Sequence, residues 1–156
     1  INDLAQTCYN EVLPLAKVKK INFKTDLIAT QNKIIYADKI ELKRVIINLL
    51  GNAIAHTFEN GEVIISTSVQ QGNCVLSVSD TGVGIPRSDI PKLFKRFSQG
   101  TSDRRSASTG LGLYLSMQIM EAHNGKIWLE SDVKEGSCFS IMIPTEKLQE
   151  ITKEKV

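Results

Sequence analysis

Apolar residues recur at helical spacing in several stretches of the chain, and two of these predict helices in the first third. The first stretch covers residues 4–17. Pro14 should kink or end that helix, because proline lacks the backbone N–H that the helix needs. The second and strongest stretch follows Asp38, which is a good N-cap. Glu41 comes three residues later, as in a capping box, and the helix should run to about His56.

The second predicted helix has a broad apolar face, which marks it as a helix of the core. The members of this face are Ile40, Val45, Ile46, Leu49, Leu50, Ala53 and Ile54. A third helix is predicted from about Leu111 to His123. It should end at Asn124-Gly125, a pair that is typical of a helix C-cap.

Alternating apolar and polar residues, or short apolar runs between turn signals, predict the strands. The predicted strands cover residues 21–28, 34–36, 62–69, 74–79, 126–131 and 137–143. Residues 70–73 (QQGN) should join two of them as a hairpin. Because strands and helices are mixed without strict alternation, the pattern favours an α+β two-layer sandwich over a doubly wound parallel sheet. We expect one domain over residues 1–146 and a charged tail or linker over 147–156.

Composition narrows the class of protein. A chain of 156 residues suits one compact domain, and a formal charge of +2 does not favour nucleic acid or direct membrane contact. We see no apolar run long enough to span a bilayer and no signal peptide. Since the first residue is Ile1, we expect a piece of a longer protein, which can itself be membrane-bound. The three cysteines lack metal-ligand spacing, so we expect reduced thiols and a cytoplasmic domain.

Three polar clusters carry candidate chemistry, and the first lies in the long helix. Asn48 and Asn52 are four residues apart and share one helix face. Their side-chain carbonyls are hard oxygen donors that suit Mg²⁺. Taken alone, the pair is better explained as part of a solvated polar stripe.

The second cluster, residues 80–86 (DTGVGIP), directly follows a predicted strand. Asp80 can accept a hydrogen bond from an exocyclic amine there, and the glycines allow close approach of a ligand to the backbone. A plain turn from strand to loop explains this cluster equally well. The segment that it opens, to about residue 109, is about 30 residues long and lacks clear periodicity, which is typical of a functional loop.

The third cluster, residues 108–113 (STGLGL), opens a predicted helix. Free N–H groups and the positive end of the helix dipole favour phosphate at such a place. Tight helix packing would explain the two glycines equally well.

Together and in this order, the three clusters resemble the N box, G1 box and G2 box of the GHKL ATPase and kinase superfamily. Residues 93–99 (LFKRFSQ) resemble the F box of its histidine-kinase branch. The resemblance covers about residues 4–144. It implies a Bergerat fold, with a mixed sheet of about five strands covered on one face by three helices, and an ATP lid over about residues 86–109.

The resemblance also implies site residues for ATP and Mg²⁺. Asp80 would accept a hydrogen bond from the adenine amino group, Asn52 would ligate Mg²⁺, and Asn48 would lie near the metal and phosphates. The catalytic set would be Asn48, Asn52 and Arg104, with Arg104 or Arg105 neutralising the γ-phosphate. The implied nucleotide contacts are Asn48, Asn52, His56, Asp80, Gly82, Gly84, Ile85, Phe97, Arg104, Arg105, Thr109, Gly110, Leu111, Gly112 and Leu113.

Within the superfamily, the ATPase branches place a glutamate one helical turn before the metal-binding asparagine to activate water. Here that position is Asn48, which cannot act as a base. The resemblance therefore implies a protein-histidine kinase of a two-component system. It would phosphorylate a histidine in a dimerising helical hairpin outside this chain, and a response regulator receiver domain would accept the phosphoryl group next. The fragment alone would be monomeric, and residues 48–53 (NLLGNA) resemble hybrid kinases in particular.

The chain departs from the family pattern at two places, which leaves rival readings open. Ala55 stands where many relatives carry a phosphate-binding lysine, and Ala107-Ser108 stand where the G2 box usually begins with glycines. One rival is a degenerate nucleotide-binding regulatory module without kinase activity. The other is a serine kinase of the anti-sigma type, which shares the boxes but not the F box. Neither His56 nor His123 resembles the phosphoacceptor. We expect His56 near the nucleotide and His123 at a helix C-terminus, where the dipole favours it.

Overall fold

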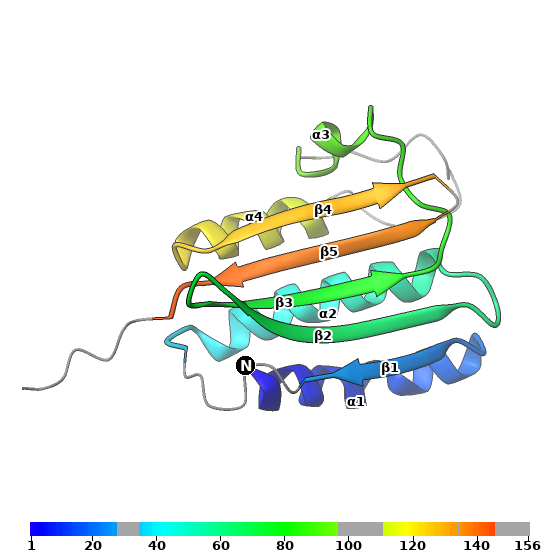
Figure 1. Cartoon of the computed structure of the whole chain (residues 1–156), viewed down its shortest axis with the longest axis horizontal. Helices are drawn as coiled ribbons and strands as arrows, with labels where there is room; N and C mark the ends of the chain where they lie inside the picture. The colour runs from blue at the N-terminus through cyan, green and yellow to red at the C-terminus, as the bar shows by residue number, and fades with distance from the viewer. Residues whose placement is uncertain (28–34, 97–110, 134, 146–156) are drawn as a thin grey trace, which may run out of the picture.

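A computed structural model describes residues 1–27, 35–96, 111–133 and 135–145 (Figure 1). Five strands form one mixed sheet in the order β1-β2-β3-β5-β4. The elements are α1 (Asn2–Val18), β1 (Asn22–Asp26), α2 (Lys39–His56), β2 (Glu62–Gln70), β3 (Asn73–Asp80), α3 (Ile90–Leu93), α4 (Gly112–Ala122), β4 (Lys126–Asp132) and β5 (Gly136–Ile143). The predicted α+β sandwich with a five-stranded mixed sheet is confirmed.

The sheet joins two hairpins to one parallel edge strand. Strands β2 and β3 form one antiparallel hairpin and β4 and β5 form the other, while β3 pairs with β5 to unite them. Strand β1 runs parallel to β2, so the connection between them must cross over, and it contains α2. Figure 1 shows α1, α2 and α4 together on one side of this sheet.

The core lies between these helices and the inner face of the sheet. Alternate residues of the strands point to this face, since successive side chains of a strand point to opposite sides. Across β2, β3 and β5, one inner row consists of Ile65, Val78 and Phe139, all of them buried. Helix α2 meets this face with its own buried side chains, which are Leu42, Val45, Ile46, Leu49, Leu50, Ala53 and Ile54.

The opposite, outer face of the sheet carries more polar side chains. Ser77 and Ser140 lie opposite each other on β3 and β5, and their hydroxyl oxygens are 2.8 Å apart. Their neighbours Ser79 and Cys138 form the next pair, with a hydrogen bond of 3.2 Å from Oγ to Sγ. The sheet is thus amphipathic, as expected for a two-layer fold with helices on one face.

The predicted first helix is confirmed as α1, which contains Pro14 and continues to Val18 rather than ending at the proline. Two local predictions were wrong. Ile35 and Tyr36 belong to no strand. Ile40 is 72% exposed rather than part of the apolar face of α2, whose first buried residue is Leu42. Residues 28–34 and the predicted tail 147–156 lie outside the described residues.

The start of α2 follows half of the predicted capping box. The carboxylate of Asp38 accepts hydrogen bonds from the backbone N–H groups of Ile40 and Glu41, at 2.8 and 3.0 Å. Glu41 does not return the bond, because its side chain pairs with Arg44. Instead the backbone N–H of Asp38 donates to Nε2 of His123, at 3.0 Å.

His123 therefore joins the end of α4 to the start of α2. Its Nδ1 lies 2.7 Å from the backbone carbonyl oxygen of Ile119 and its Nε2 accepts from the N–H of Asp38, so both ring nitrogens have backbone partners. The predicted C-cap of α4 is confirmed. Asn124 adopts a left-handed φ of +53°, and the N–H of Gly125 donates to Met120.

Among the described residues, no helix is long and apolar enough to cross a membrane. The three cysteines are free thiols. Cys8 is on the buried face of α1, and burial raises the pKa of its thiol to about 11, so it is an inert core residue.

The Asp38 cap yields a test of the α2 start. Hydrogen bonds from the N–H groups of Glu41 and Ile40 hold the pKa of Asp38 below its ordinary value. A lowered pKa stabilises the fold above the unfolded-state pKa of about 4, and this contribution is lost as pH falls through the folded-state pKa. Asp38→Ala should unfold at a lower urea concentration than the wild type at neutral pH, and the difference should shrink as the pH is lowered below about 4.

Asp38→Asn keeps a capping oxygen and should remain closer to the wild type at neutral pH. Urea unfolding curves monitored by circular dichroism would measure all three proteins across this range. A gap between Asp38→Ala and the wild type that stays constant down to the lowest pH would show that the carboxylate charge does not stabilise the cap.

Candidate functional site

Asp80 is the last residue of β3 and points to the inner face of the sheet, in line with Leu76 and Val78. It is only 9% exposed, and Oδ1 accepts a hydrogen bond of 2.8 Å from the N–H of Gly82. Burial raises the pKa of the Asp80 carboxyl, although the backbone N–H groups of Gly82 and Ser137 and the nearby His56 oppose the rise. A carboxylate held in this way is a strong acceptor at the edge of the core.

The loop after Asp80 packs so closely on its neighbours that its glycines are required. A Cβ at Gly82 would overlap the backbone carbonyl of His56, at the end of α2. Gly84 and Ile85 lie against the end of the edge strand β4, at the same end of the sheet: Gly84 contacts the backbone of Asp132, and the N–H of Ile85 donates to Ser131 Oγ at 2.8 Å. The glycines thus allow protein backbone to approach, so their spacing positions Asp80 relative to α2.

Asn48, Asn52 and His56 follow one another at intervals of four residues on α2 and so form one stripe, which we call the α2 stripe. The neighbouring residues Leu49 and Ala53 are buried, which fixes the direction of the stripe. His56, at one end, touches the Asp80 loop. At the other end, Asn48 Nδ2 donates to Ser116 Oγ of α4 at 3.0 Å. The stripe therefore runs from the carboxylate to α4.

Helix α4 begins at the far end of this stripe. Leu111 is its N-cap, and its apolar side chain cannot accept a hydrogen bond from the first N–H groups. Gly112 and Leu113 form the first turn, and Gly112 lies against the Asn48 carboxamide. The first N–H groups and the helix dipole make this end of α4 suitable for an anion.

The Asn52 side chain is half-buried in the middle of the stripe, and within the described part of the chain its carboxamide makes no hydrogen bond. An amide oxygen is a suitable ligand for Mg²⁺. The described residues contain no group of three or more His, Cys, Asp or Glu side chains that could hold a metal ion. The donor set therefore fits a magnesium ion that takes one ligand from Asn52 and the rest from phosphate and water.

The predicted site residues thus fall into two groups. The structure brings together Asn48, Asn52 and His56 with Asp80 and Gly82 at one end and with Leu111, Gly112 and Leu113 at the other. Gly84 and Ile85 follow in the same loop, and their contacts are with the end of β4. Phe97, Arg104, Arg105, Thr109 and Gly110 lie outside the described residues.

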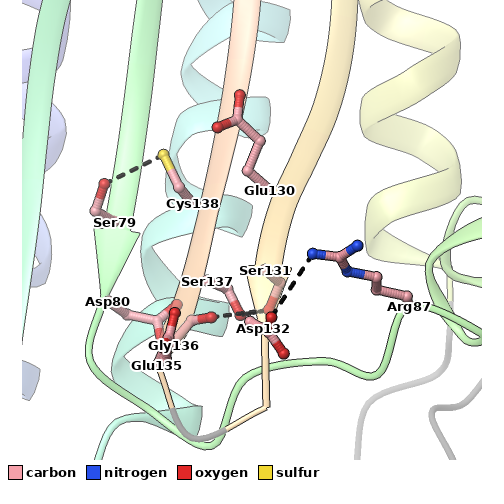
Figure 2. Close-up of a pocket in the computed structure, with 10 residues that line it drawn as sticks. All are labelled: Ser79, Asp80, Arg87, Glu130, Ser131, Asp132, Glu135, Gly136, Ser137 and Cys138. Carbon is pink, nitrogen blue, oxygen red and sulfur yellow. Dashed lines mark hydrogen bonds and ion pairs between the residues drawn. The ribbon is translucent and has the colours of Figure 1, made fainter.

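A pocket at the Asp80 end of the sheet extends along its outer side, and Asp80, Gly136 and Ser137 are among the residues that line it (Figure 2). Its volume is ≈ 390 Å³, and it opens where β3 and β4 end and β5 begins. Ser79, Glu130 and Cys138 occupy outer-face positions in the strand register, and Arg87 forms an exposed ion pair of 3.7 Å with Asp132. The α2 stripe belongs to a helix on the opposite side of the sheet from this pocket. We therefore assign the candidate site to the helix side of the sheet.

Sequence reasoning missed three residues at the site. Gly136 has a φ of +92°, and a Cβ there would overlap the carbonyl of Asp80. Ser137 donates its backbone N–H to the Asp80 carboxyl, and its Oγ lies 3.0 Å from that of Ser131. Ser116 holds Asn48. The pair Gly136-Ser137 opens a strand directly after a turn, which was a usable signal, whereas nothing local distinguished Ser116.

The chain matches known proteins along most of its length. Residues 37–147 match the family model described as histidine kinase-, DNA gyrase B- and HSP90-like ATPase. The circadian input-output histidine kinase CikA of Synechococcus elongatus is 37% identical over 153 residues. These cover 96% of this chain but only 20% of CikA, so the chain spans about a fifth of that relative.

Solved structures agree with this match. The catalytic domain of the histidine kinase ThkA is 30% identical, with a TM-score of 0.81 over 92% of this chain and 93% of that one. ThkA in complex with the response regulator protein TrrA is similar over 93% of this chain and 40% of that chain, with 28% identity and a TM-score of 0.76. The candidate site, the sheet order and these similarities agree that the chain belongs to the histidine kinase-, DNA gyrase B- and HSP90-like ATPase family and has the fold of a histidine kinase catalytic domain.

Proposed function

We propose that this domain binds Mg·ATP along the α2 stripe and transfers the γ-phosphoryl group to a histidine on a helical hairpin outside the chain. The observation that carries the proposal is the α2 stripe itself. It joins a buried carboxylate, Asp80, to the N-terminal end of α4 through two asparagines. A nucleotide has the same order of groups: a base with an amine, then phosphates with a metal ion.

The adenine end of the nucleotide lies at Asp80. One carboxylate oxygen accepts from the N–H of Gly82, which leaves acceptor capacity for the exocyclic amine of adenine. Since Asp80 is buried, an amine that pairs with it is shielded from water, and such a hydrogen bond to a charged acceptor is stronger than a neutral one. This supports selection of a base that carries an amino group at that edge.

The phosphates lie between Asn52 and the start of α4. Mg²⁺, when bound, neutralises phosphate charge and holds the phosphate oxygens in place. Asn52 supplies one oxygen ligand, and the first N–H groups of α4 face the phosphates from the other side. Asn48 stands between the two, beside Gly112. Arg104 and Arg105, which lie outside the described residues, are proposed to neutralise the γ-phosphate.

The α2 stripe supports a kinase rather than an ATPase. Its members are two carboxamides and one imidazole, so the described part of the stripe holds no carboxylate that could activate water. Phosphoryl transfer needs mainly positioning and charge neutralisation, which this domain can supply without a base. The nucleophile is then the acceptor histidine of the hairpin.

The two histidines of the chain are poor candidates for that acceptor. Both ring nitrogens of His123 are engaged, by Ile119 and Asp38, far along α2 from Asp80. His56 is exposed at the end of α2 beside the adenine end and away from the phosphate end. We further propose that a response regulator receiver domain accepts the phosphoryl group from the hairpin, since the similar kinase ThkA forms a complex with a response regulator.

Nucleotide titration tests the site. We expect Mg·ATP to bind the wild type with micromolar to sub-millimolar affinity, as measured by titration calorimetry. Asp80→Asn and Asn52→Ala should each bind at least about tenfold more weakly, because each loses a hydrogen bond or ligand to a charged group. Glu130→Gln, on the outer pocket, is the matched control and should bind as the wild type does.

Either of two results would contradict this assignment. A well-folded wild type that binds no ATP or ADP at millimolar nucleotide would favour the degenerate regulatory module. Weak binding by Glu130→Gln together with normal binding by Asp80→Asn would move the site to the outer pocket.

The pH dependence of binding tests the role of the Asp80 charge. Adenine needs the ionised carboxylate as an acceptor, and burial raises the pKa of that group above its ordinary value of about 4. The affinity for Mg·ATP should therefore fall as the pH is lowered toward this raised pKa, before ordinary carboxyl groups protonate. The residual binding of Asp80→Asn should lack this decline. An identical pH profile in both proteins would show that Asp80 does not titrate with binding.

Phosphoryl transfer tests the reaction. With radiolabelled Mg·ATP and a separately supplied hairpin from a related kinase, the domain should label the hairpin with an acid-labile, base-stable phosphate, as expected for phosphohistidine. A hairpin whose histidine is replaced by glutamine should remain unlabelled. An acid-stable label would favour the serine kinase alternative.

A further inference from the structure

The Asn48 side chain contacts two small residues of α4, Gly112 and Ser116. We call this contact surface the seat. A Cβ added to Gly112 would overlap Oδ1 of the Asn48 carboxamide, so a larger residue would displace this side chain from its present position. One turn further along α4, Ser116 Oγ accepts a hydrogen bond of 3.0 Å from Asn48 Nδ2. The carboxamide therefore lies flat against the first turns of α4, with both of its polar atoms over that helix.

The seat is part of the contact between α2 and α4. Gly112, Ser116 and Met120 follow at intervals of four residues, so they share one face of α4. Met120 is fully buried and Ser116 is only 2% exposed, which identifies this face as the one that packs on the core and on α2. A serine hydroxyl at such a place needs a partner, because a buried polar group without a hydrogen bond is costly. Asn48 is that partner.

The geometry of the seat orients the amide. With Nδ2 on Ser116, Oδ1 lies over Gly112, one turn closer to the start of α4. The start of α4 is the end that favours phosphate, and an oxygen there is the atom that a phosphate-bound cation can use. An amide turned the other way would present its N–H groups to that end instead.

We propose that Ser116 and Gly112 are positioning residues that hold the Asn48 carboxamide with its oxygen toward the phosphates and the metal ion. The part of this inference that concerns nucleotide binding rests on the proposed function. The part that concerns the contact between Asn48 and α4 rests on the ligand-free structure alone. Because Asn48 is held by two residues of α4, a shift of α4 along α2 would also move the Asn48 carboxamide. The position of this carboxamide at the phosphate site therefore depends on how the two helices pack.

The test is a double-mutant cycle on Ser116 and Asn48. Ser116→Ala removes the acceptor and should weaken Mg·ATP binding about 2- to 10-fold, the range of one ordinary hydrogen bond. It should weaken binding of metal-free ADP less than twofold, because Asn48 serves the metal and the terminal phosphate. In the Asn48→Ala background, Ser116→Ala should have no further effect. Ser77→Ala is the matched control, since it also removes a hydrogen bond between two side chains, on the outer face of the sheet.

A second readout needs no nucleotide. In ¹⁵N-labelled, ligand-free protein, the side-chain NH₂ resonances of Asn48 should shift in Ser116→Ala and in Gly112→Ala but not in Ser77→Ala. Unmoved resonances in Ser116→Ala would overturn the proposal, as would equal losses of Mg·ATP affinity with and without Asn48. If the wild type bound no nucleotide, the proposed function would fail, and the resonances alone would decide whether the seat exists.

Discussion

The packing of α2 on the inner face of the sheet is the constraint on which both the core and the site depend. Residues such as Leu49, Leu50 and Ala53 are almost completely buried, so the helix cannot rotate without exposing apolar surface. The orientation of α2 about its own axis in turn sets the direction of the α2 stripe between Asp80 and α4. One hydrophobic contact thus contributes both to the stability of the fold and to the alignment of the polar groups at the proposed nucleotide site.

The burial of Asp80 beside the core has a cost in free energy. A carboxyl group at the edge of the core loses hydration, and the raised pKa reports that loss. The N–H groups of Gly82 and Ser137 compensate for only part of it. Proteins commonly retain such groups where function requires them, so a site of this kind trades stability for recognition. The close backbone contacts of Gly82 and Gly136 serve this purpose, since they bring donors to the carboxylate without side chains in the way.

Local signals in the sequence predicted the elements well. The N-cap at Asp38, the hairpin after β2 and the C-cap at Asn124 each depend on a few neighbouring residues, and each was confirmed. The error at Ile40 has a non-local cause, since the orientation of α2 on the sheet leaves this side chain in solvent. The asparagines and Asp80 could be identified by a family resemblance, but Ser116 could not. Its role exists only because two helices distant in sequence meet.

The sheet order has a consequence for how the domain folds. The β2–β3 and β4–β5 hairpins are each local in sequence, whereas the seam between β3 and β5 joins segments that a long stretch of chain separates. Closing so long a loop is entropically costly, and contacts of this kind slow folding. Asp80 and Ser137 face each other at one end of that seam. The carboxylate therefore acquires its environment only when the two halves of the sheet join, so the proposed recognition of the base would be a property of the completed sheet and of neither hairpin alone.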